Sequence, residues 1–167
     1  LTVDALADYD TNYKMNPPLV TEAGRQALIE ALRDGTIEVI ATDHAPHTQM
    51  EKDEMFGEAP NGIIGMETAF AVLNTVLVRT GLVGIGRIIE AMTINPARLI
   101  GLKKGTLAEG ADADVAVFDT ETAWLVDPEK FQSKSHNCPW NGQTLIGRPV
   151  LTLVGGRPTW QDGKILI

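Results

Sequence analysis

The sequence predicts an α/β fold in which a helical and α/β part is followed by a small β module. A helix pattern at residues 21–34 is joined by a short turn to an apolar, β-branched run at residues 37–41, and this order is typical of α/β proteins. After residue 105 the pattern changes to short apolar runs separated by Gly-rich turns, which indicates strands. The change divides the chain into residues 1–104 and 105–167.

The composition is that of an ordinary globular protein. Of the 167 residues, 44% are hydrophobic and 22% are charged, which are the usual proportions for a single domain with its own core. The formal net charge of −8 argues against a nucleic-acid partner, because phosphate binding needs clustered Lys and Arg. No window approaches the roughly 20 consecutive apolar residues of a membrane span. Cys138 is the only cysteine, so no disulfide can form within the chain, and we expect a reducing, cytoplasmic location.

The first residues indicate that the chain is a piece of a longer protein. It begins with Leu1, and residues 1–10 have neither the basic start nor the apolar core of a signal peptide.

Farther on, Pro17 and Pro18 exclude a regular helix or a central strand and hold the backbone extended. Such a rigid segment can present the Asn16 side chain to a ligand, although a structural Pro-Pro turn is the commoner explanation of such residues.

The clearest helix is predicted at residues 21–34. Thr21 can cap its N-terminus, Glu22 lies at the positive end of the helix dipole, and Gly35 ends it. The predicted apolar stripe consists of Ala27, Leu28, Ala31 and Leu32. The predicted strand at residues 37–41 follows after a short turn. Helix, turn and strand together form an αβ unit, which ends just before Thr42.

Polar, chemically reactive side chains follow this predicted strand. The chain reads Thr-Asp-His-Ala-Pro-His from Thr42 to His47. The carboxyl ends of buried strands are where α/β folds place their active sites, so Asp43, His44 and His47 are candidates for a metal or catalytic site. The alternative is that an Asp and a His merely cap the following turn.

A long irregular segment at residues 47–65 follows the polar run. Loops of this length beside a strand-end Asp are often functional, and the mixture of charges, Met and Phe predicts a flap over a small ligand. Asn61-Gly62 near its end is a turn signal, and Gly62 permits close approach of the backbone. A plain surface loop with a tight turn is the alternative.

Further helices and short strands complete the prediction. Asn95 can cap a short helix that has Pro96 at its first position. His136 and Cys138 are two residues apart but lack a second pair of ligands, so we do not expect a metal there. Two more helices are expected at residues 66–80 and 87–93. Strands are expected at residues 115–118, 124–126, 150–154, 158–161 and 164–167, with turns at Gly155-Gly156 and Asp162-Gly163.

Beyond these local patterns, the chain resembles one family along nearly its whole length. The strings that carry the resemblance are KMNPPL, DGTIEVIATDHAPHT, APNGIIGMETAF, NPARLIGL, GADADVAVFD and FQSKSHNCPWNGQTLIGRPV. Together they resemble the C-terminal part of bacterial dihydroorotases of the amidohydrolase superfamily. The Asp-His-Ala-Pro-His string with Met-Asn-Pro-Pro upstream resembles dihydroorotases more than it resembles hydantoinases or allantoinases.

The resemblance implies a TIM (β/α)8 barrel flanked by a small β-sandwich domain. Residues 37–42 would be the last barrel strand, residues 1–104 the C-terminal part of the barrel, and residues 105–167 the C-terminal share of the β domain. The other metal ligands of the family and its substrate-binding arginine would lie upstream of this chain. The chain alone is therefore expected to be inactive.

The resemblance also implies roles for five residues. Asp43 would bind the catalytic zinc and act as general acid and base. Asn16 and His47 would contact the substrate, and Asn61-Gly62 would contact it through the backbone.

Three positions differ from what the motif alone suggests. His44 matches no metal ligand of the family. Many members have Phe where this chain has Asn61, so a contact there is expected from the backbone. Many also have Arg where Val20 stands, and Val20 receives no role.

The implied activity is the reversible, zinc-dependent closure of N-carbamoyl-L-aspartate to L-dihydroorotate in pyrimidine (UMP) biosynthesis. The implied cofactor is one or two zinc ions, and the implied assemblies are a homodimer and an association with aspartate transcarbamoylase. One alternative is a hydantoinase- or allantoinase-type amidohydrolase. Another is a non-catalytic homologue that only scaffolds aspartate transcarbamoylase.

Overall fold

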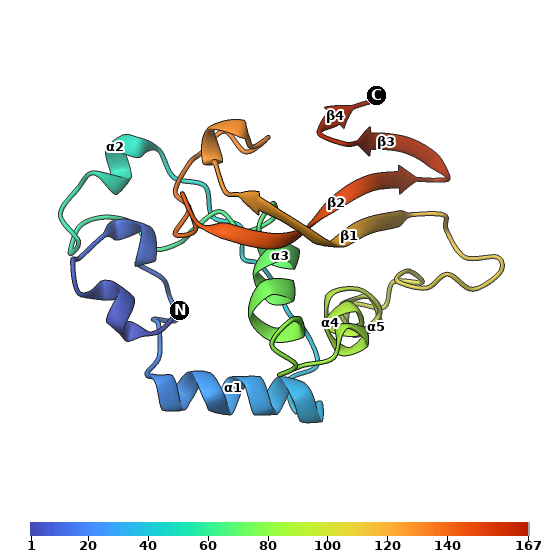
Figure 1. Cartoon of the computed structure of the whole chain (residues 1–167), viewed down its shortest axis with the longest axis horizontal. Helices are drawn as coiled ribbons and strands as arrows, with labels where there is room; N and C mark the ends of the chain where they lie inside the picture. The colour runs from blue at the N-terminus through green and yellow to red at the C-terminus, as the bar shows by residue number, and fades with distance from the viewer. Residues whose placement is uncertain (167) are drawn as a thin grey trace.

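The computed structural model describes residues 1–166, in which mostly short helices precede one antiparallel sheet (Figure 1). Within that range, no helix is long and apolar enough to cross a membrane. The helices are α1 (Glu22–Asp34), α2 (Gln49–Lys52), α3 (Ala69–Leu73), the π-helical turn η3 (Asn74–Val78), α4 (Ile85–Met92) and α5 (Ile94–Leu99), with 3₁₀ turns η1 (Val3–Leu6), η2 (Thr11–Tyr13) and η4 (Pro128–Lys130). The strands are β1 (Val115–Leu125), β2 (Thr144–Val154), β3 (Arg157–Gln161) and β4 (Lys164–Ile165). Ile167, the last residue of the predicted final strand, lies outside the described residues.

Helix α1 forms where the sequence predicts it but buries a different face. The Thr21 hydroxyl caps its first turn, and Gly35 ends it with a φ of 92°. Ile29 and Leu32 are its buried residues, whereas Leu28 is 50% exposed. Ala27 is exposed as well, so the predicted stripe is wrong at Ala27 and Leu28, because the partners of the helix, and not its own sequence, decide which face is buried.

The predicted strand at residues 37–42 is wrong as a sheet strand. A strand needs a neighbour to complete its hydrogen-bond ladder, and none lies beside this segment within residues 1–166. Its hydrogen bonds go to helices instead. The Ile37 N–H donates to the Ala31 carbonyl at 2.8 Å, and the Ile40 N–H donates to the Ala91 carbonyl at 2.9 Å. Ile37 and Ile40 are only half-buried and pack on the apolar core of the helices.

Two apolar cores hold the helices and the sheet together. Ile88 in the first core is fully buried, and Val126 in the second is 1% exposed. The second core draws on both predicted parts of the chain, so the β module packs directly on the helical part. The first core consists of Ile29, Leu32, Leu77, Val83, Ile88 and Ala91, and the second of Ile64, Ala71, Val126, Cys138 and Leu145.

Helix α3 is shorter than the predicted helix at residues 66–80 and widens into the π turn at Asn74. The Asn74 side chain is buried, and its amide donates to the carbonyls of Thr120 at 3.0 Å and Ile146 at 2.9 Å. Gly147 permits this contact, since a Cβ there would lie 2.8 Å from Asn74 Nδ2. Asn74 therefore ties the helix to strands β1 and β2, which run over α3 in Figure 1.

The sheet is a meander in the order β1-β2-β3-β4, with every neighbouring pair antiparallel. The predicted strands at residues 115–118 and 124–126 form one strand, β1, because an irregularity in the register absorbs the polar residues between them. The Asp119 carboxylate stabilises it by accepting from the N–H groups of Glu121 at 2.8 Å and Thr122 at 3.1 Å.

The tight turns of the sheet are those that the sequence predicts. Gly155-Gly156, with φ values of 56° and 77°, connects β2 to β3, and Asp162-Gly163, with 46° and 85°, connects β3 to β4. Positive φ at both central residues matches the twist of a two-residue hairpin, which is why Gly is favoured there.

The predicted cap of helix α5 is wrong. Thr93 occupies the N-cap position, and Asn95 lies inside the helix. The Asn95 amide instead donates to the Glu38 carbonyl at 2.9 Å. Asn95 thus holds the segment at residues 37–42 against the helices.

Candidate functional site

The Asp43-His44 turn has a constrained backbone. Asp43 has a φ of 43°, in the left-handed region that Asp adopts more readily than most residues. His44 Nδ1 accepts hydrogen bonds from the N–H groups of Gly65 at 3.2 Å and Met66 at 3.4 Å, so the ring proton lies on Nε2. The His44 ring thus ties the turn to the segment before α3. Asp43 itself is exposed, and its carboxylate is open to a ligand.

His47 faces the Asn61-Gly62 turn. Its Nε2 lies 2.9 Å from the Asn61 carbonyl oxygen, and because a carbonyl only accepts, Nε2 carries the proton of this hydrogen bond. The other ring nitrogen, Nδ1, lies 3.9 Å from Glu51 Oε2. The side chain is 22% exposed, and its Nε2 is already engaged with the Asn61 carbonyl.

Gly62 lies where no larger residue fits. Its φ is 120°, and a Cβ there would lie 2.5 Å from Ala45 Cβ and 3.4 Å from His47 Nε2. Its N–H donates to the Lys14 carbonyl at 2.9 Å. The turn therefore packs against the His47 turn on one side and against the segment that leads to Asn16 on the other.

The structure brings together three of the five predicted site residues. His47, Asn61 and Gly62 are in direct contact. Asp43 and Asn16 are exposed on the flanking segments. The roles assigned to all five by resemblance stay predictions.

Two buried polar residues behind this site were not identified from the sequence. Asn137 is 4% exposed, and its Nδ2 donates to the carbonyls of Ala45 at 2.9 Å and Gly62 at 3.1 Å. The Ser135 hydroxyl accepts from the His47 N–H at 3.1 Å. The only signal for them in the sequence is their place in the string SKSHNCPW, whose spacing gives no connection with residues 45–62.

Two lysines fasten the loop that the sequence predicts as a flap. Lys52 is 4% exposed, and its ammonium donates to the carbonyls of Thr11 and Pro60, each at 2.9 Å. Burial, and to a lesser degree the nearby Lys14, lowers the pKa of Lys52. Lys14 donates to the Ala59 carbonyl at 2.6 Å. The loop is thus tied to the N-terminal segment and does not stand free.

The same loop contains helix α2, which is absent from the sequence prediction. Thr48 and Glu51 form a capping box at its start. Hydrogen bonds from the Thr48 N–H and hydroxyl hold the pKa of the Glu51 carboxyl below its usual value of 4.5. The pKa of Glu51 is thus lower in the folded than in the unfolded chain. The capping box therefore stabilises the fold fully at pH values above the unfolded pKa, and this stabilisation is lost as the pH falls through the folded pKa.

Replacing Lys52 by Met is expected to loosen this loop. Met retains much of the side-chain volume but cannot donate, so the Thr11 and Pro60 carbonyls lose hydrogen bonds to a charged group worth about 1.5–3 kcal/mol each. Limited proteolysis should cut within residues 49–63 at least about tenfold faster. Lys103→Met, at an exposed position, is the control and should leave the cleavage rate unchanged. Equal cleavage of Lys52→Met and the parent protein would contradict this role.

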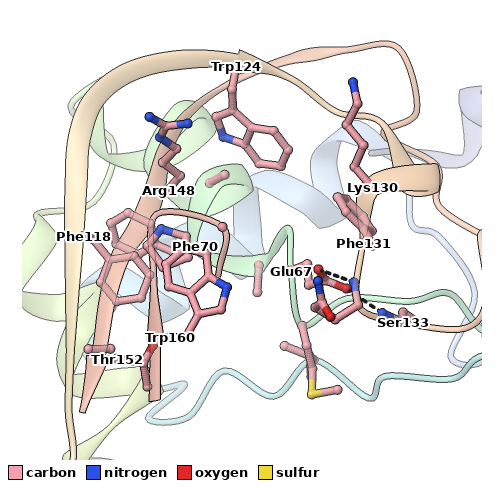
Figure 2. A pocket seen from close by; sticks show the side chains of 18 of the residues that line it. Glu67, Phe70, Phe118, Trp124, Lys130, Phe131, Ser133, Arg148, Thr152 and Trp160 are labelled. Carbon is pink, nitrogen blue, oxygen red and sulfur yellow. Dashed lines mark hydrogen bonds between the residues drawn. The ribbon is translucent and has the colours of Figure 1, made fainter. Parts of the chain in front are cut away.

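A large apolar cavity lies beside the candidate site and not within it. Its volume is about 840 Å³, and its walls come from the sheet, α3 and the segment after η4 (Figure 2). Phe70 and Phe118 stack in it with ring centroids 4.0 Å apart. Thr42 and His44 also line it, whereas none of the five predicted site residues does. The cavity therefore belongs to the junction of the two parts of the chain.

The described residues do not complete a metal site. Structural and catalytic zinc sites use at least three protein ligands. Within residues 1–166, no group of three or more His, Cys, Asp or Glu side chains is arranged to hold a metal ion. His136 Nδ1 lies 2.9 Å from Glu129 Oε1, and burial raises the pKa of the Cys138 thiol, which disfavours metal-binding thiolate. The exposed Asp43 carboxylate has the chemistry of one zinc ligand.

Comparison with known proteins shows to which family the chain is similar and how much of its relatives' length it covers. Residues 12–159 match the model of the amidohydrolase family. The dihydroorotase of Bacillus caldolyticus is 52% identical over 155 residues, which are 93% of this chain and 36% of the relative. The dihydroorotase of Anaeromyxobacter dehalogenans is 51% identical over 160 residues, which are 96% of this chain and 37% of the relative. The chain thus spans little more than a third of the length of the curated relatives it matches.

Solved structures share the fold. The L-hydantoinase (dihydropyrimidinase) of Arthrobacter aurescens matches with a TM-score of 0.94 and 31% identity over 100% of this chain and 38% of its own. The D-hydantoinase (dihydropyrimidinase) of a Thermus species matches with a TM-score of 0.85 and 31% identity over 93% of this chain and 35% of its own. The resemblance carried by the sequence strings is confirmed, and the chain belongs to the amidohydrolase family.

Proposed function

We propose that this chain is part of a zinc-dependent dihydroorotase, which interconverts N-carbamoyl-L-aspartate and L-dihydroorotate in pyrimidine biosynthesis. The observation that carries the proposal is an identity of about half with dihydroorotases along nearly the whole chain. The coupling of the Asp-His-Ala-Pro-His turn to the Asn61-Gly62 turn supports it, because both turns carry residues to which the resemblance gives site roles. A cytoplasmic location fits such an activity.

In this proposal each residue has a defined task. Ring opening adds the oxygen of water to the amide carbonyl carbon and breaks the C–N bond. Asp43 takes the proton of the water and delivers it to the leaving nitrogen, and ring closure reverses both transfers. His47 contacts the substrate through Nδ1, because Nε2 is engaged with Asn61. Asn16 donates from its exposed amide.

The metal in this proposal is one or two zinc ions, with Asp43 as one ligand. Zinc supplies a Lewis acid that polarises the amide carbonyl. The remaining ligands would come from outside this chain, since residues 1–166 offer no complete set.

We further propose that residues 1–104 complete a TIM barrel and that residues 105–167 form a share of its small β domain. The coverage of little more than a third of the relatives supports a barrel that is only partly contained in this chain. Exposed apolar side chains support it as well, because Leu28 is 50% and Leu99 74% exposed, as surfaces that pack on further barrel elements would be. A homodimer and an association with aspartate transcarbamoylase belong to the same proposal.

The activity of the protein that contains this chain tests the proposal. The zinc-loaded protein should turn over dihydroorotate, lose that turnover when the metal is chelated, and regain it when zinc is restored. The isolated 167-residue chain with added zinc should show none, and turnover by it would contradict the fragment proposal.

Substrate profiling separates the alternatives. The structural match to hydantoinases at 31% identity favours a hydantoinase-type enzyme as the second candidate. Faster turnover of hydantoin or allantoin than of dihydroorotate would support that candidate. A metal-free protein that turns over none of these substrates but binds aspartate transcarbamoylase would instead be a scaffold.

A further inference from the structure

The Asn137 side chain connects the two turns that carry the predicted substrate contacts. Its Nδ2 group donates to the carbonyls of Ala45, in the turn before His47, and of Gly62, in the facing turn. Its Oδ1 accepts from the His47 N–H at 3.3 Å. One amide therefore bridges two turns that lie 17 positions apart in the chain (45 and 62).

The Ser135 hydroxyl completes this bridge. It lies within hydrogen-bond distance of both the N–H and the carbonyl of His47 and 2.7 Å from Asn137 Oδ1. Ser135 is 8% and Asn137 4% exposed, so water does not easily replace either side chain. The backbone of the residue that carries the imidazole is thus held from two sides.

The segment that carries these residues is anchored by its own contacts. The Asn137 carbonyl accepts from the Ile64 N–H at 3.1 Å, and Cys138 lies in the second core. The Glu67 carboxylate accepts from the N–H groups of Gln132 and Ser133, each at 3.0 Å, as the dashed lines in Figure 2 mark. The bridge is therefore also held through Glu67, which lies outside the two turns that it joins.

We propose that Asn137 is a positioning residue, which holds the His47 turn against the Asn61-Gly62 turn and so sets how the groups of both turns are presented to the substrate. The proposal rests on the proposed function for the identity of that substrate. Asn is required because two donors must meet two carbonyls while one acceptor meets an N–H. Asp has the same shape without the donors, and Gln is longer by one methylene.

The test is Asn137→Asp in the zinc-loaded protein that contains this chain. Asp turns a second carboxylate oxygen toward the Ala45 and Gly62 carbonyls, which repel it, so the two turns should separate. We expect kcat/KM for dihydroorotate to fall about 100-fold. Most of the loss should lie in KM, because the bridge makes no contact with Asp43. Asn141→Asp, at an exposed position outside the bridge, is the matched control and should retain both constants.

Two further measurements separate positioning from a general loss of structure. In a double-mutant cycle with His47→Ala, the effects on KM should be strongly non-additive if Asn137 acts through His47. The ¹⁵N shift of His47 Nε2 should also report loss of its hydrogen bond to the Asn61 carbonyl in Asn137→Asp, without reference to activity. Additive effects with an unchanged ring signal would overturn the proposal.

The outcome remains decisive if Asn137→Asp does not fold. Ser135→Ala removes the hydroxyl that contacts both the His47 backbone and Asn137 Oδ1, and it should raise KM about tenfold at unchanged zinc content. A wild-type KM in this variant would then overturn the proposal. An error in the proposed function would give a different result, because the parent protein itself would then not turn over dihydroorotate.

Discussion

Asp43→Asn is expected to lower kcat for dihydroorotate by about 10²- to 10⁴-fold in the zinc-loaded protein. The amide cannot take up the proton of the attacking water, and as a neutral ligand it binds zinc more weakly than a carboxylate does. Asn tolerates the left-handed φ of 43° as well as Asp does, and the position is exposed. The free energy of unfolding should therefore change by less than about 0.5 kcal/mol. Steady-state kinetics, zinc content and denaturant unfolding measure the three effects.

The control for this change is Asp8→Asn, which removes the same charge at another exposed position. It should retain the parent rate, so a general effect of net charge is excluded. A near-parental rate in Asp43→Asn would show that the proton transfer belongs to another group. A parental rate per bound zinc, with less zinc bound, would assign Asp43 to metal binding alone.

Asn74→Ala is expected to destabilise the protein by about 2–4 kcal/mol. The change removes the Asn74 donor from the part-buried carbonyls of Thr120 and Ile146, of which the Ile146 carbonyl keeps a second donor, the Thr75 hydroxyl at 3.3 Å, and the loss of a buried donor costs about 1–3 kcal/mol. The truncated side chain also leaves a void beside Gly147, where the backbone approaches closely. Denaturant unfolding should show the loss as a lower midpoint with an unchanged slope.

Asn141→Ala is the matched control for this prediction, because it removes the same atoms from an exposed position. Its unfolding midpoint should shift by less than the equivalent of about 0.5 kcal/mol. Gly147→Ala tests the same junction from the strand side, since its φ of 96° and the 2.8 Å approach to Asn74 Nδ2 both oppose a Cβ. If Asn74→Ala and Asn141→Ala shift the midpoint equally, the helix and the sheet are not coupled through Asn74.

Local features of the fold follow from the sequence because the groups that cause them are neighbours in the chain. The Thr21 cap and Gly35 end of α1 are such features, as are the hairpin turns. The predicted strand at residues 37–42 fails for the opposite reason. Its residues have strand character, but a strand exists only with a partner, and residues 1–166 provide none.

For the candidate site, the sequence predicts which residues matter but not how they are arranged. The residues of the polar run, Asp43 and His47, and the Asn61-Gly62 turn could be selected from the sequence, because their types and the resemblance single them out. Their arrangement could not be selected, since the hydrogen bond from His47 Nε2 to the Asn61 carbonyl depends on how the loop returns.

The sequence by itself determined the family of this chain and the helix and turns whose caps are local, and it supplied a short list of candidate site residues. Only the tertiary structure decided that Asn137 bridges the two turns of the site and that Asn74 joins helix to sheet. Both are buried amides whose partners lie far away in the chain. The spacing of residues in a sequence does not encode such partners, because the unpaired carbonyls that require them exist only once the chain has folded.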